Sequence, residues 1–136
     1  MESCIFCKIA SGEIPSNTLY LDDDLRAILD VAPAAPGHAL ILPRKHFRDV
    51  TEMPGELLGK IMTLGGRIGQ AQQKALSCEG FNLIQNNGEA AGQTVFHFHL
   101  HVIPRKKDDG ALALWEPGES SAGEREEVLQ KLLKEL

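Results

Sequence analysis

The segment VFHFHLHVI, residues 95–103, places a histidine at every second position, with apolar residues between them. Side chains alternate between the two faces of a β-strand, so the three histidines share one face and the intervening apolar residues share the other. Such a strand can pack its apolar face on a hydrophobic core while the other face stays polar, as in an antiparallel sheet. The three histidines, His97, His99 and His101, are most of the five in the chain.

The other periodic segments predict an α+β fold with an antiparallel sheet of about five strands, one long helix, a short N-terminal helix and a C-terminal helical extension. Pro54 is placed at the start of the long helix, and Gly80 is expected to cap its C-terminal end. We predict strands in residues 18–31 (two strands around an acidic turn), 39–42, 81–86 and 95–103, and helices in residues 4–10, from Pro54 past Ala75, and in the tail after Gly118.

The tail SSAGEREEVLQKLLKEL predicts an amphipathic helix outside the main domain. Ser121 and Glu124 have the spacing of a capping box, which favours a helix start at this point. We therefore expect one domain over residues 1–118 and a helical extension over residues 119–136. The apolar stripe of this helix consists of Val128, Leu129, Leu132, Leu133 and Leu136.

Composition indicates a globular chain without a membrane or nucleic-acid partner. The 136 residues are 43% hydrophobic and 24% charged, which argues against disorder. The net charge of −5 gives no basic face of the kind that nucleic-acid binding requires. No apolar run reaches the roughly 20 residues that span a bilayer, and the N-terminus does not resemble a signal peptide. With an odd number of cysteines, three, the sequence favours a reducing cytoplasm.

A row of three imidazoles allows three interpretations. It can be a solvated polar face, a metal site, or a site of phosphoryl or nucleotidyl transfer in which a neutral imidazole attacks phosphorus. The loop before the strand, NNGEAAGQTV, favours the third interpretation. Glycine lets a ligand approach the backbone closely, and backbone N–H groups bind phosphate oxygens.

The stretch GQTVFHFHLHVIPR resembles the signature of the histidine triad superfamily, in which three histidines alternate with apolar residues and two apolar residues follow. The stretches CIFCKIASGEIPS, ILDVAPAAPGHALILPRKH and GFNLIQNNGEAAGQ resemble the other blocks of that family in the same order, so the resemblance covers roughly residues 3–117. LWEPG is similar to the tail of the Hint branch, the nucleoside phosphoramidases. IPRKK resembles the Fhit branch, the dinucleotide polyphosphate hydrolases.

The resemblance implies the role of each active-site residue. His99 is the expected nucleophile, His101 the phosphate contact that helps with proton transfer, and His38 the fourth active-site histidine; with His97 they form the catalytic set. Asp30 is expected to hold the ribose hydroxyls. The resemblance assigns Asn86, Gly92, Gln93 and Thr94 to phosphate and leaving-group contacts, and Phe6, Ile9 and Ile28 to the wall of the base pocket, although each can equally be a turn or core residue.

The pair Cys4 and Cys7 in a C-x-x-C motif can be redox-active, metal-binding, or two buried thiols without a metal. Some bacterial members of the family carry structural zinc on two cysteines and two histidines, and His46 and His97 match the histidine positions. The resemblance therefore implies a structural Zn²⁺, and no catalytic metal is required. Cys78 is interpreted as buried and inert.

Taken together, these patterns predict a hydrolase or nucleotidyl transferase that acts on purine nucleoside phosphoramidates (AMP, GMP or their amides) through a nucleotidyl-histidine intermediate. One alternative is a dinucleoside polyphosphate hydrolase of the same superfamily. Others, from different classes, are a nucleotide-binding regulatory or scaffold protein and a zinc-binding interaction module. The resemblance also implies a homodimer in which two sheets join into a larger one.

Overall fold

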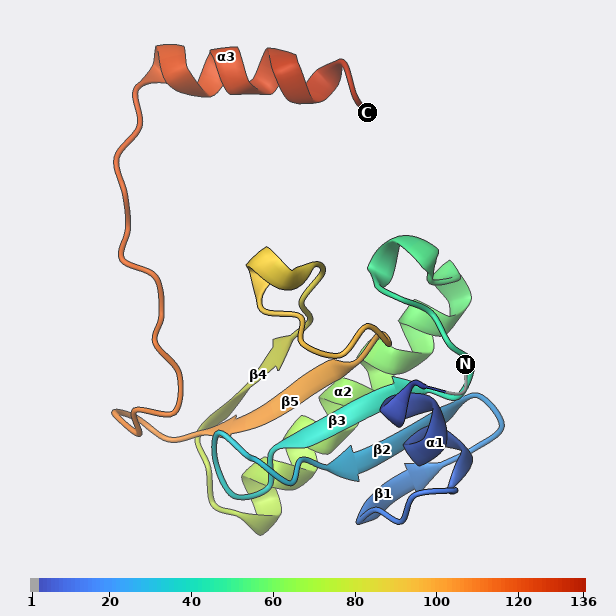
Figure 1. Cartoon of the computed structure of the whole chain (residues 1–136). Helices are drawn as coiled ribbons and strands as arrows, with labels where there is room; N and C mark the ends of the chain where they lie inside the picture. The colour runs from blue at the N-terminus through green and yellow to red at the C-terminus, as the bar shows by residue number, and fades with distance from the viewer. Residues whose placement is uncertain (1–2) are drawn as a thin grey trace.

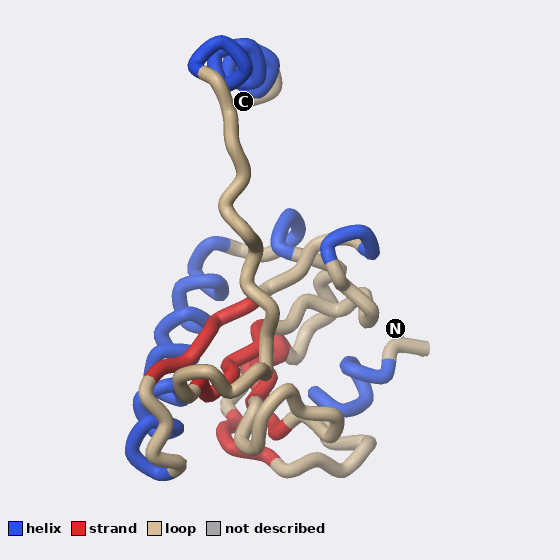
Figure 2. The backbone as a smooth tube through the Cα atoms, turned by 90° about the vertical axis from the view of Figure 1, so that its left-hand side faces the viewer, coloured by secondary structure: helices blue, strands red, loops and turns tan. Residues whose placement is uncertain are grey.

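Five antiparallel strands form one sheet that carries a long helix on one face and a short helix on the other (Figures 1 and 2). This computed structural model describes residues 3–136. The strand order is β1-β2-β3-β5-β4, with β1 at Thr18–Leu21, β2 at Leu25–Leu29, β3 at Ala39–Pro43, β4 at Gly80–Ile84 and β5 at Leu100–Arg105. The helices are α1 at Ile5–Ser11, α2 at Gly55–Ala75 and α3 at Ala122–Leu133, with short 3-10 turns η1 at Val50–Glu52 and η2 at Glu89–Ala91. The predicted α+β class and five-stranded antiparallel sheet are confirmed.

The main core lies between α2 and the sheet. Ile61 and Leu64 of α2 are buried against apolar side chains of the strands. Gly65 and Gly69 bring the helix backbone close to the sheet, since a Cβ on Gly69 would lie 2.5 Å from the ring of Phe81. The buried members of this core are Leu25, Ala27, Ala39, Ile41, Met53, Ile61, Leu64, Phe98, Leu100 and Val102.

A smaller core on the opposite face holds α1. Ala10 of α1 is fully buried, and Phe6 and Ile9 pack beside it on strands β2 and β3. The helix begins at Cys4, whose Sγ accepts the N–H of Cys7, and ends at Gly12, which has a φ of 86°. The left-handed conformation of Gly12 is one that residues with a Cβ rarely adopt. This short helix thereby lies on the face that carries the histidines.

Two of the expected boundaries differ from the structure, and a third is confirmed. The strand predicted at residues 95–103 is paired only from Leu100 onward, because the N–H of Phe98 donates to the carbonyl of Phe47 rather than to a neighbouring strand. Helix α2 ends at Ala75, so the prediction that Gly80 caps it is wrong, and Gly80 begins β4. The expected start of this helix at Pro54 is confirmed, since Pro54 is its N-cap residue.

Helix α3 stands apart from the sheet at the end of an extended linker (Figures 1 and 2). Its predicted cap is present, because Ser121 Oγ accepts the N–H of Glu124 at 3.1 Å. All twelve residues of α3 are exposed to solvent. Among residues 3–136, none of the helices combines the length and apolar character of a membrane span.

Candidate functional site

His99 and His101 lie in the wall of a cavity of about 310 Å³ on the α1 face of the sheet. Strand β5 positions His101, and the extended segment before it positions His99, so both rings emerge from the same side of the chain. The two ring centroids are 5.0 Å apart. The cavity is lined by Phe6, Ile9, Pro15, Ser16, Asn17, Ile28, Leu29, Asp30, Val31, Ala32, Leu40, Thr94, Val95, His99 and His101.

The backbone determines which nitrogen of His99 carries a proton. Nδ1 of His99 lies 2.7 Å from the carbonyl oxygen of His97. A carbonyl only accepts hydrogen bonds, so Nδ1 is the protonated nitrogen and Nε2 of the neutral ring keeps a lone pair. Burial lowers the pKa of His99 below its ordinary value of 6.5, which keeps the ring neutral near pH 7. The edge contact with Phe6, with centroids 4.9 Å apart, fixes the ring plane.

His101 has the opposite tautomer to His99, and its contact with His38 determines this. The N–H of Ala34 donates to Nδ1 of His38 at 3.0 Å, so the proton of a neutral His38 is on Nε2. That Nε2 lies 2.9 Å from Nδ1 of His101 and donates to it. Nε2 of His101 therefore carries the proton of its ring. Burial, with the neighbouring imidazoles, lowers the pKa of His101 to about 4.

Asp30 lies at the end of β2, beside the two paired imidazoles. Its Oδ1 accepts the N–H of Ala32 at 2.9 Å, and its Oδ2 lies 3.6 Å from Nε2 of His38. Ligand atoms of Asp30, His38 and His101 lie within 4.8 Å of one another, as in a small metal site. Neutral His38, however, presents an N–H there rather than the lone pair a metal ion needs. The carboxylate thus borders the cavity as a hydrogen-bond acceptor.

The structure brings together most, but not all, of the predicted nucleotide-binding residues. Thr94 lines the cavity, whereas Gln93 is 1% exposed and its side chain points toward neighbouring backbone groups. The side chain of Gln93 accepts the N–H of Gly88 and donates to the carbonyls of Arg48 and Val95. Asn86 and Gly92 lie side by side in the same loop and outside the residues that line the cavity. Phe6, Ile9 and Ile28 line it as expected.

Several lining residues were not predicted from the sequence, among them three that follow one another in the chain. Pro15, Ser16 and Asn17 follow α1 and border the cavity, because the carbonyl of Asn17 accepts the N–H of Leu29 on β2. A Pro-Ser-Asn stretch is ordinary turn chemistry, so the sequence contains no signal that separates this role from a plain connection.

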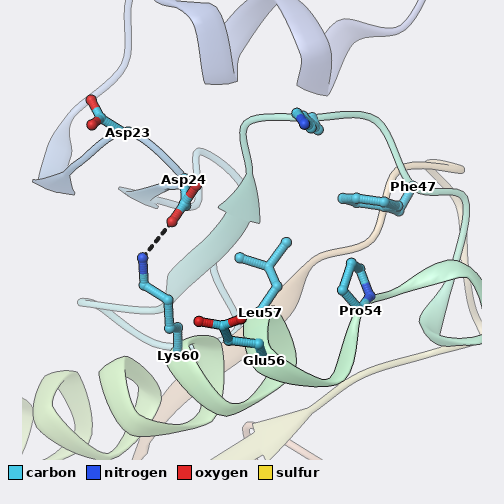
Figure 3. Close-up of a pocket in the computed structure, with 8 residues that line it drawn as sticks. Asp23, Asp24, Phe47, Pro54, Glu56, Leu57 and Lys60 are labelled. Atoms are coloured by element: carbon cyan, nitrogen blue, oxygen red, sulfur yellow. Dashed lines mark hydrogen bonds and ion pairs between the residues drawn. The ribbon is translucent and has the colours of Figure 1, made fainter.

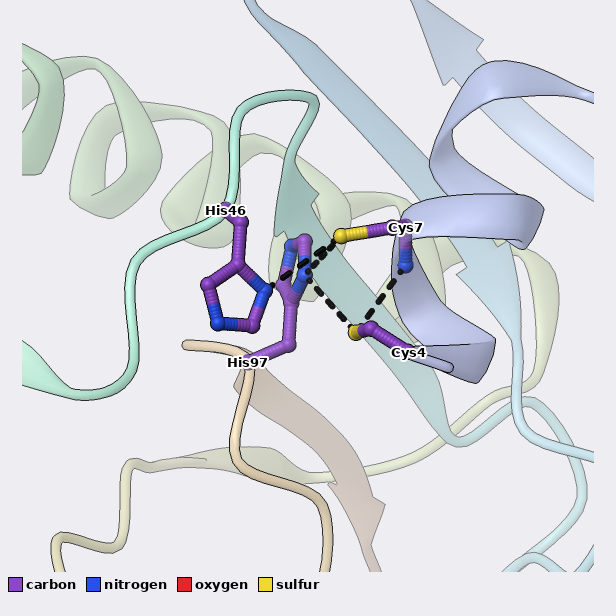
Figure 4. A group of neighbouring side chains, drawn as sticks. All are labelled: Cys4, Cys7, His46 and His97. Carbon is purple, nitrogen blue, oxygen red and sulfur yellow. Dashed lines mark hydrogen bonds between the residues drawn. The ribbon is translucent and has the colours of Figure 1, made fainter. Parts of the chain in front are cut away.

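Cys4, Cys7, His46 and His97 form a second group next to the cavity (Figure 4). Nδ1 of His97 lies 3.5 Å from Sγ of Cys4 and 3.4 Å from Sγ of Cys7, and Nδ1 of His46 lies 3.3 Å from Sγ of Cys7. Two ligands of one tetrahedral Zn²⁺, with bonds of about 2.3 Å to sulfur and 2.0 Å to nitrogen, are about 3.5 Å apart.

The protonation of His97 suits this geometry. Its Nε2 lies 2.8 Å from the carbonyl of Pro43 and donates to it, so Nδ1 presents a lone pair to the two sulfurs. The ring is fully buried, and burial lowers its pKa to about 4. The four residues thus form a group that could hold Zn²⁺, with ligands from α1, from the loop after β3 and from the segment before β5.

Another cavity, of about 330 Å³, lies between the β1–β2 turn and the start of α2 (Figure 3). Its charged groups are partly paired, since Nζ of Lys60 contacts Asp24 at 2.5 Å and Asp22 at 3.8 Å. The residues that line it include no histidine or cysteine, and they are Asp23, Asp24, Lys45, Phe47, Pro54, Glu56, Leu57 and Lys60. This cavity lacks the chemistry of the histidine site.

Comparison with known proteins places this geometry in a family. The family model described as the HIT domain matches residues 11–108. Protein hit of Bacillus subtilis is 43% identical over 115 residues, which are 84% of this chain and 79% of that protein. The adenosine 5'-monophosphoramidase of Saccharomyces cerevisiae is 38% identical over 134 residues, 98% of this chain and 80% of that protein. An adenylylsulfatase of Arabidopsis thaliana is 44% identical over 112 residues, 82% of this chain and 55% of that protein.

Solved structures agree with the sequence comparisons. A HIT family protein from Bacillus anthracis superposes with a TM-score of 0.88 at 35% identity, covering 99% of this chain and 98% of that chain. A Zn-bound histidine triad family protein from Mycobacterium smegmatis superposes with a TM-score of 0.78 at 37% identity, covering 99% of both chains. With its domain matched over residues 11–108 and two of its alternating histidines in one cavity, the chain belongs to the histidine triad (HIT) family.

Proposed function

We propose that the protein is a nucleotide hydrolase that cleaves purine nucleoside phosphoramidates at the α-phosphorus through a nucleotidyl-histidine intermediate. One observation carries the proposal: the backbone leaves a lone pair on Nε2 of His99 and a proton on Nε2 of His101 in the same cavity. A nucleophile beside a hydrogen-bond donor is what substitution at phosphorus requires. The names of the yeast and Arabidopsis relatives support an adenylyl substrate.

In the first step, Nε2 of His99 attacks the α-phosphorus, the P–N bond to the amine breaks, and a P–Nε2 bond forms. Nδ1–H of His99 stays bonded to the carbonyl of His97, which stabilises the positive charge that develops on the ring. Nε2–H of His101 protonates the departing amine nitrogen. Water then attacks the phosphorus, gives a proton back to Nε2 of His101, and breaks the P–Nε2 bond, which releases the nucleotide and restores neutral His99.

The nucleoside half of the substrate occupies the part of the cavity nearest α1. Asp30 accepts hydrogen bonds from two ribose hydroxyls, as a carboxylate with several free lone-pair positions can. Phe6, Ile9 and Ile28 form the apolar wall against the purine. Thr94 lies at the other border, where its hydroxyl can contact the phosphate.

Zn²⁺ on Cys4, Cys7, His46 and His97 completes this proposal as a structural ion. A closed site with four protein ligands stabilises a fold and has no position open for substrate. Bound zinc would tie α1, which carries Phe6, to the segment that carries His99. The ion would thereby fix the position of the base pocket relative to the nucleophile.

The structure favours this substrate class over dinucleoside polyphosphates, which need cations along a longer phosphate chain. Arg105 lies within the stretch IPRKK that resembles the polyphosphate hydrolases, four residues along β5 from His101. Its guanidinium is held by Asp109 and by Oδ1 of Asn82. Lys106 and Lys107 are exposed in the turn that follows, and none of these cations lines the cavity.

The test is a substrate panel with trapping of the intermediate. Purified protein is expected to hydrolyse an adenosine 5'-phosphoramidate much faster than a diadenosine polyphosphate, and rapid quenching followed by mass spectrometry should find one adenylyl group on His99. His99→Ala should lose the adduct and at least about a thousand-fold of kcat, while Lys45→Gln, in the other cavity, should keep both. Normal turnover by His99→Ala would exclude the mechanism. Tight nucleotide binding with negligible turnover would instead favour a regulatory protein.

The proposed active form is a homodimer that joins two sheets at β4. In the described part of the chain, β4 pairs on one side only, with β5, so its other edge is open. An open edge strand is a ready template for another strand. Antiparallel pairing of β4 with its own copy about a two-fold axis makes one continuous ten-stranded sheet with both α2 helices on the same face. Light scattering tests the mass of the assembly.

A further inference from the structure

Helix α3 has an apolar face that no other part of residues 3–136 covers. Val128, Leu129, Leu132 and Leu133 are 46 to 58% exposed, and Leu136 is fully exposed. An isolated helix of twelve residues is marginal in water, and most helices gain their stability by burying an amphipathic face. This helix therefore needs a surface to pack on.

The linker determines where that surface lies. Residues 113–121 contain neither helix nor strand, and they run outward past the β4 side of the sheet to α3. Two perpendicular views agree that α3 lies beyond this side and away from both helices that cover the sheet (Figures 1 and 2). The space between β4 and α3 is where a second copy stands if the two β4 strands pair.

The length of the linker matches the width of that second copy. Nine extended residues span about 30 Å. The strands of the second copy continue in the order β4-β5-β3-β2-β1, so its far strand β1 lies five strand spacings, or about 24 Å, beyond the first β4. The arm thus reaches the outer strand of the neighbouring copy with little slack.

We propose that α3 of each copy packs its apolar face into the groove between α2 and β1 of the other copy, so that two arms clasp the dimer. This inference rests on the proposed pairing at β4. The groove has a volume of about 410 Å³ and is mostly apolar. Its lining residues are Leu19, Tyr20 and Leu29 from the sheet, Gly37, and Leu64, Arg67, Ile68, Ala71, Gln72, Ala75 and Leu76 from α2 and its end.

Two features of the groove suit this occupant. Ile68, Ala71 and Ala75 follow one stripe of α2 and leave room for leucine side chains, as ridges pack into grooves. Arg67 lies at the border, over the ring of Tyr20, with a guanidinium exposed to solvent. The first two turns of α3 carry three glutamates, at positions 124, 126 and 127, that complement this cation.

Hydrogen exchange of the full-length dimer tests whether α3 is packed. The amides of α3 should exchange at least about tenfold more slowly than those of an unpacked helix. Ala71→Arg fills the groove from an exposed position and should remove that protection, and Leu132→Lys should do the same from the helix. The matched controls Gln70→Arg and Gln130→Lys place the same charge on the outer faces of the two helices and should retain protection.

A photo-crosslinker tests which copy supplies the groove. With p-benzoylphenylalanine in place of Leu132, irradiation should give a covalent species of twice the chain mass, and its linked peptide should contain residues of the α2 stripe. A product of single-chain mass would show that α3 folds onto its own groove and would overturn the inference. A dimer whose α3 exchanges freely would overturn it too, while leaving the pairing at β4 intact. A monomer in light scattering would reject the dimer itself.

Discussion

Gly69→Ala is expected to destabilise the fold although alanine is the better helix former. Gly69 lies inside α2 against the ring of Phe81 on β4, and a Cβ there would sit 2.5 Å from three ring carbons. Carbon atoms in favourable contact are about 3.5–4.0 Å apart, so the ring or the helix must move by about 1 Å. Overpacking of this kind costs about 1–3 kcal/mol, and the higher helix propensity of alanine returns about 1 kcal/mol. The net expectation is a loss of up to about 2 kcal/mol.

Gly59→Ala provides the matched control in the same helix. A Cβ at Gly59 would meet nothing within 4 Å, so the helix propensity acts alone and should stabilise the protein by about 1 kcal/mol. Urea denaturation, at one fixed protein concentration because of the proposed dimer, measures both changes. The two variants should move the midpoint in opposite directions. A Gly69→Ala protein as stable as the Gly59→Ala protein would refute the close packing of α2 on β4.

Three further predictions concern the site. His46→Gln removes one of four zinc ligands and should lower the zinc content of the purified protein from about one per chain and reduce its melting temperature, while Lys45→Gln should change neither; atomic absorption and calorimetry decide. Burial lowers the pKa of His101 from 6.5 to about 4, so the unfolded chain takes up a proton at this position at a higher pH than the folded protein. The free energy of unfolding that neutral His101 supports is therefore fully present above about pH 6.5, and about 3 kcal/mol of it is lost as the pH falls toward 4. Urea titrations at several pH values should show a smaller dependence of stability on pH for His101→Gln. Asp30→Ala should raise KM for an adenosine phosphoramidate by about tenfold to a hundredfold through the loss of ribose hydrogen bonds, with a smaller change for a substrate that lacks these hydroxyls.

Local signals in the sequence were sufficient for most elements of the fold. Alternation around His101, three-to-four spacing in α2, and the Ser121 cap each act within a few residues, so each could be recognised in isolation. The ends of the strands and helices were harder to predict from local patterns. The segment at His97 and His99 has the pattern of a strand, yet its pairing with β3 stops at Leu100, and the N–H of Phe98 donates to the carbonyl of Phe47 instead.

The same distinction between local patterns and distant contacts applies to the functional site. The alternating spacing indicated that the three histidines share one face, whereas the proposed zinc ligands and the role of Asp30 came from the resemblance to the histidine triad family. The burial of Gln93 in backbone hydrogen bonds depends on Arg48, 45 residues away in the sequence. The contribution of Pro15–Asn17 to the cavity depends on where α1 lies on the sheet. Neither contact leaves a local pattern.

The sequence by itself determined that three imidazoles share one face of an extended segment, since the period of two follows from strand geometry alone. Only the tertiary structure decided how these imidazoles differ. A carbonyl in its own segment sets the proton of His99, the amide of Ala34 acts through His38 on His101, and the carbonyl of Pro43 turns His97 toward two cysteines. The physical reason is that a hydrogen bond with a backbone group, direct for His97 and His99 and relayed through His38 for His101, selects one tautomer of each ring, and the tautomer selects the chemistry.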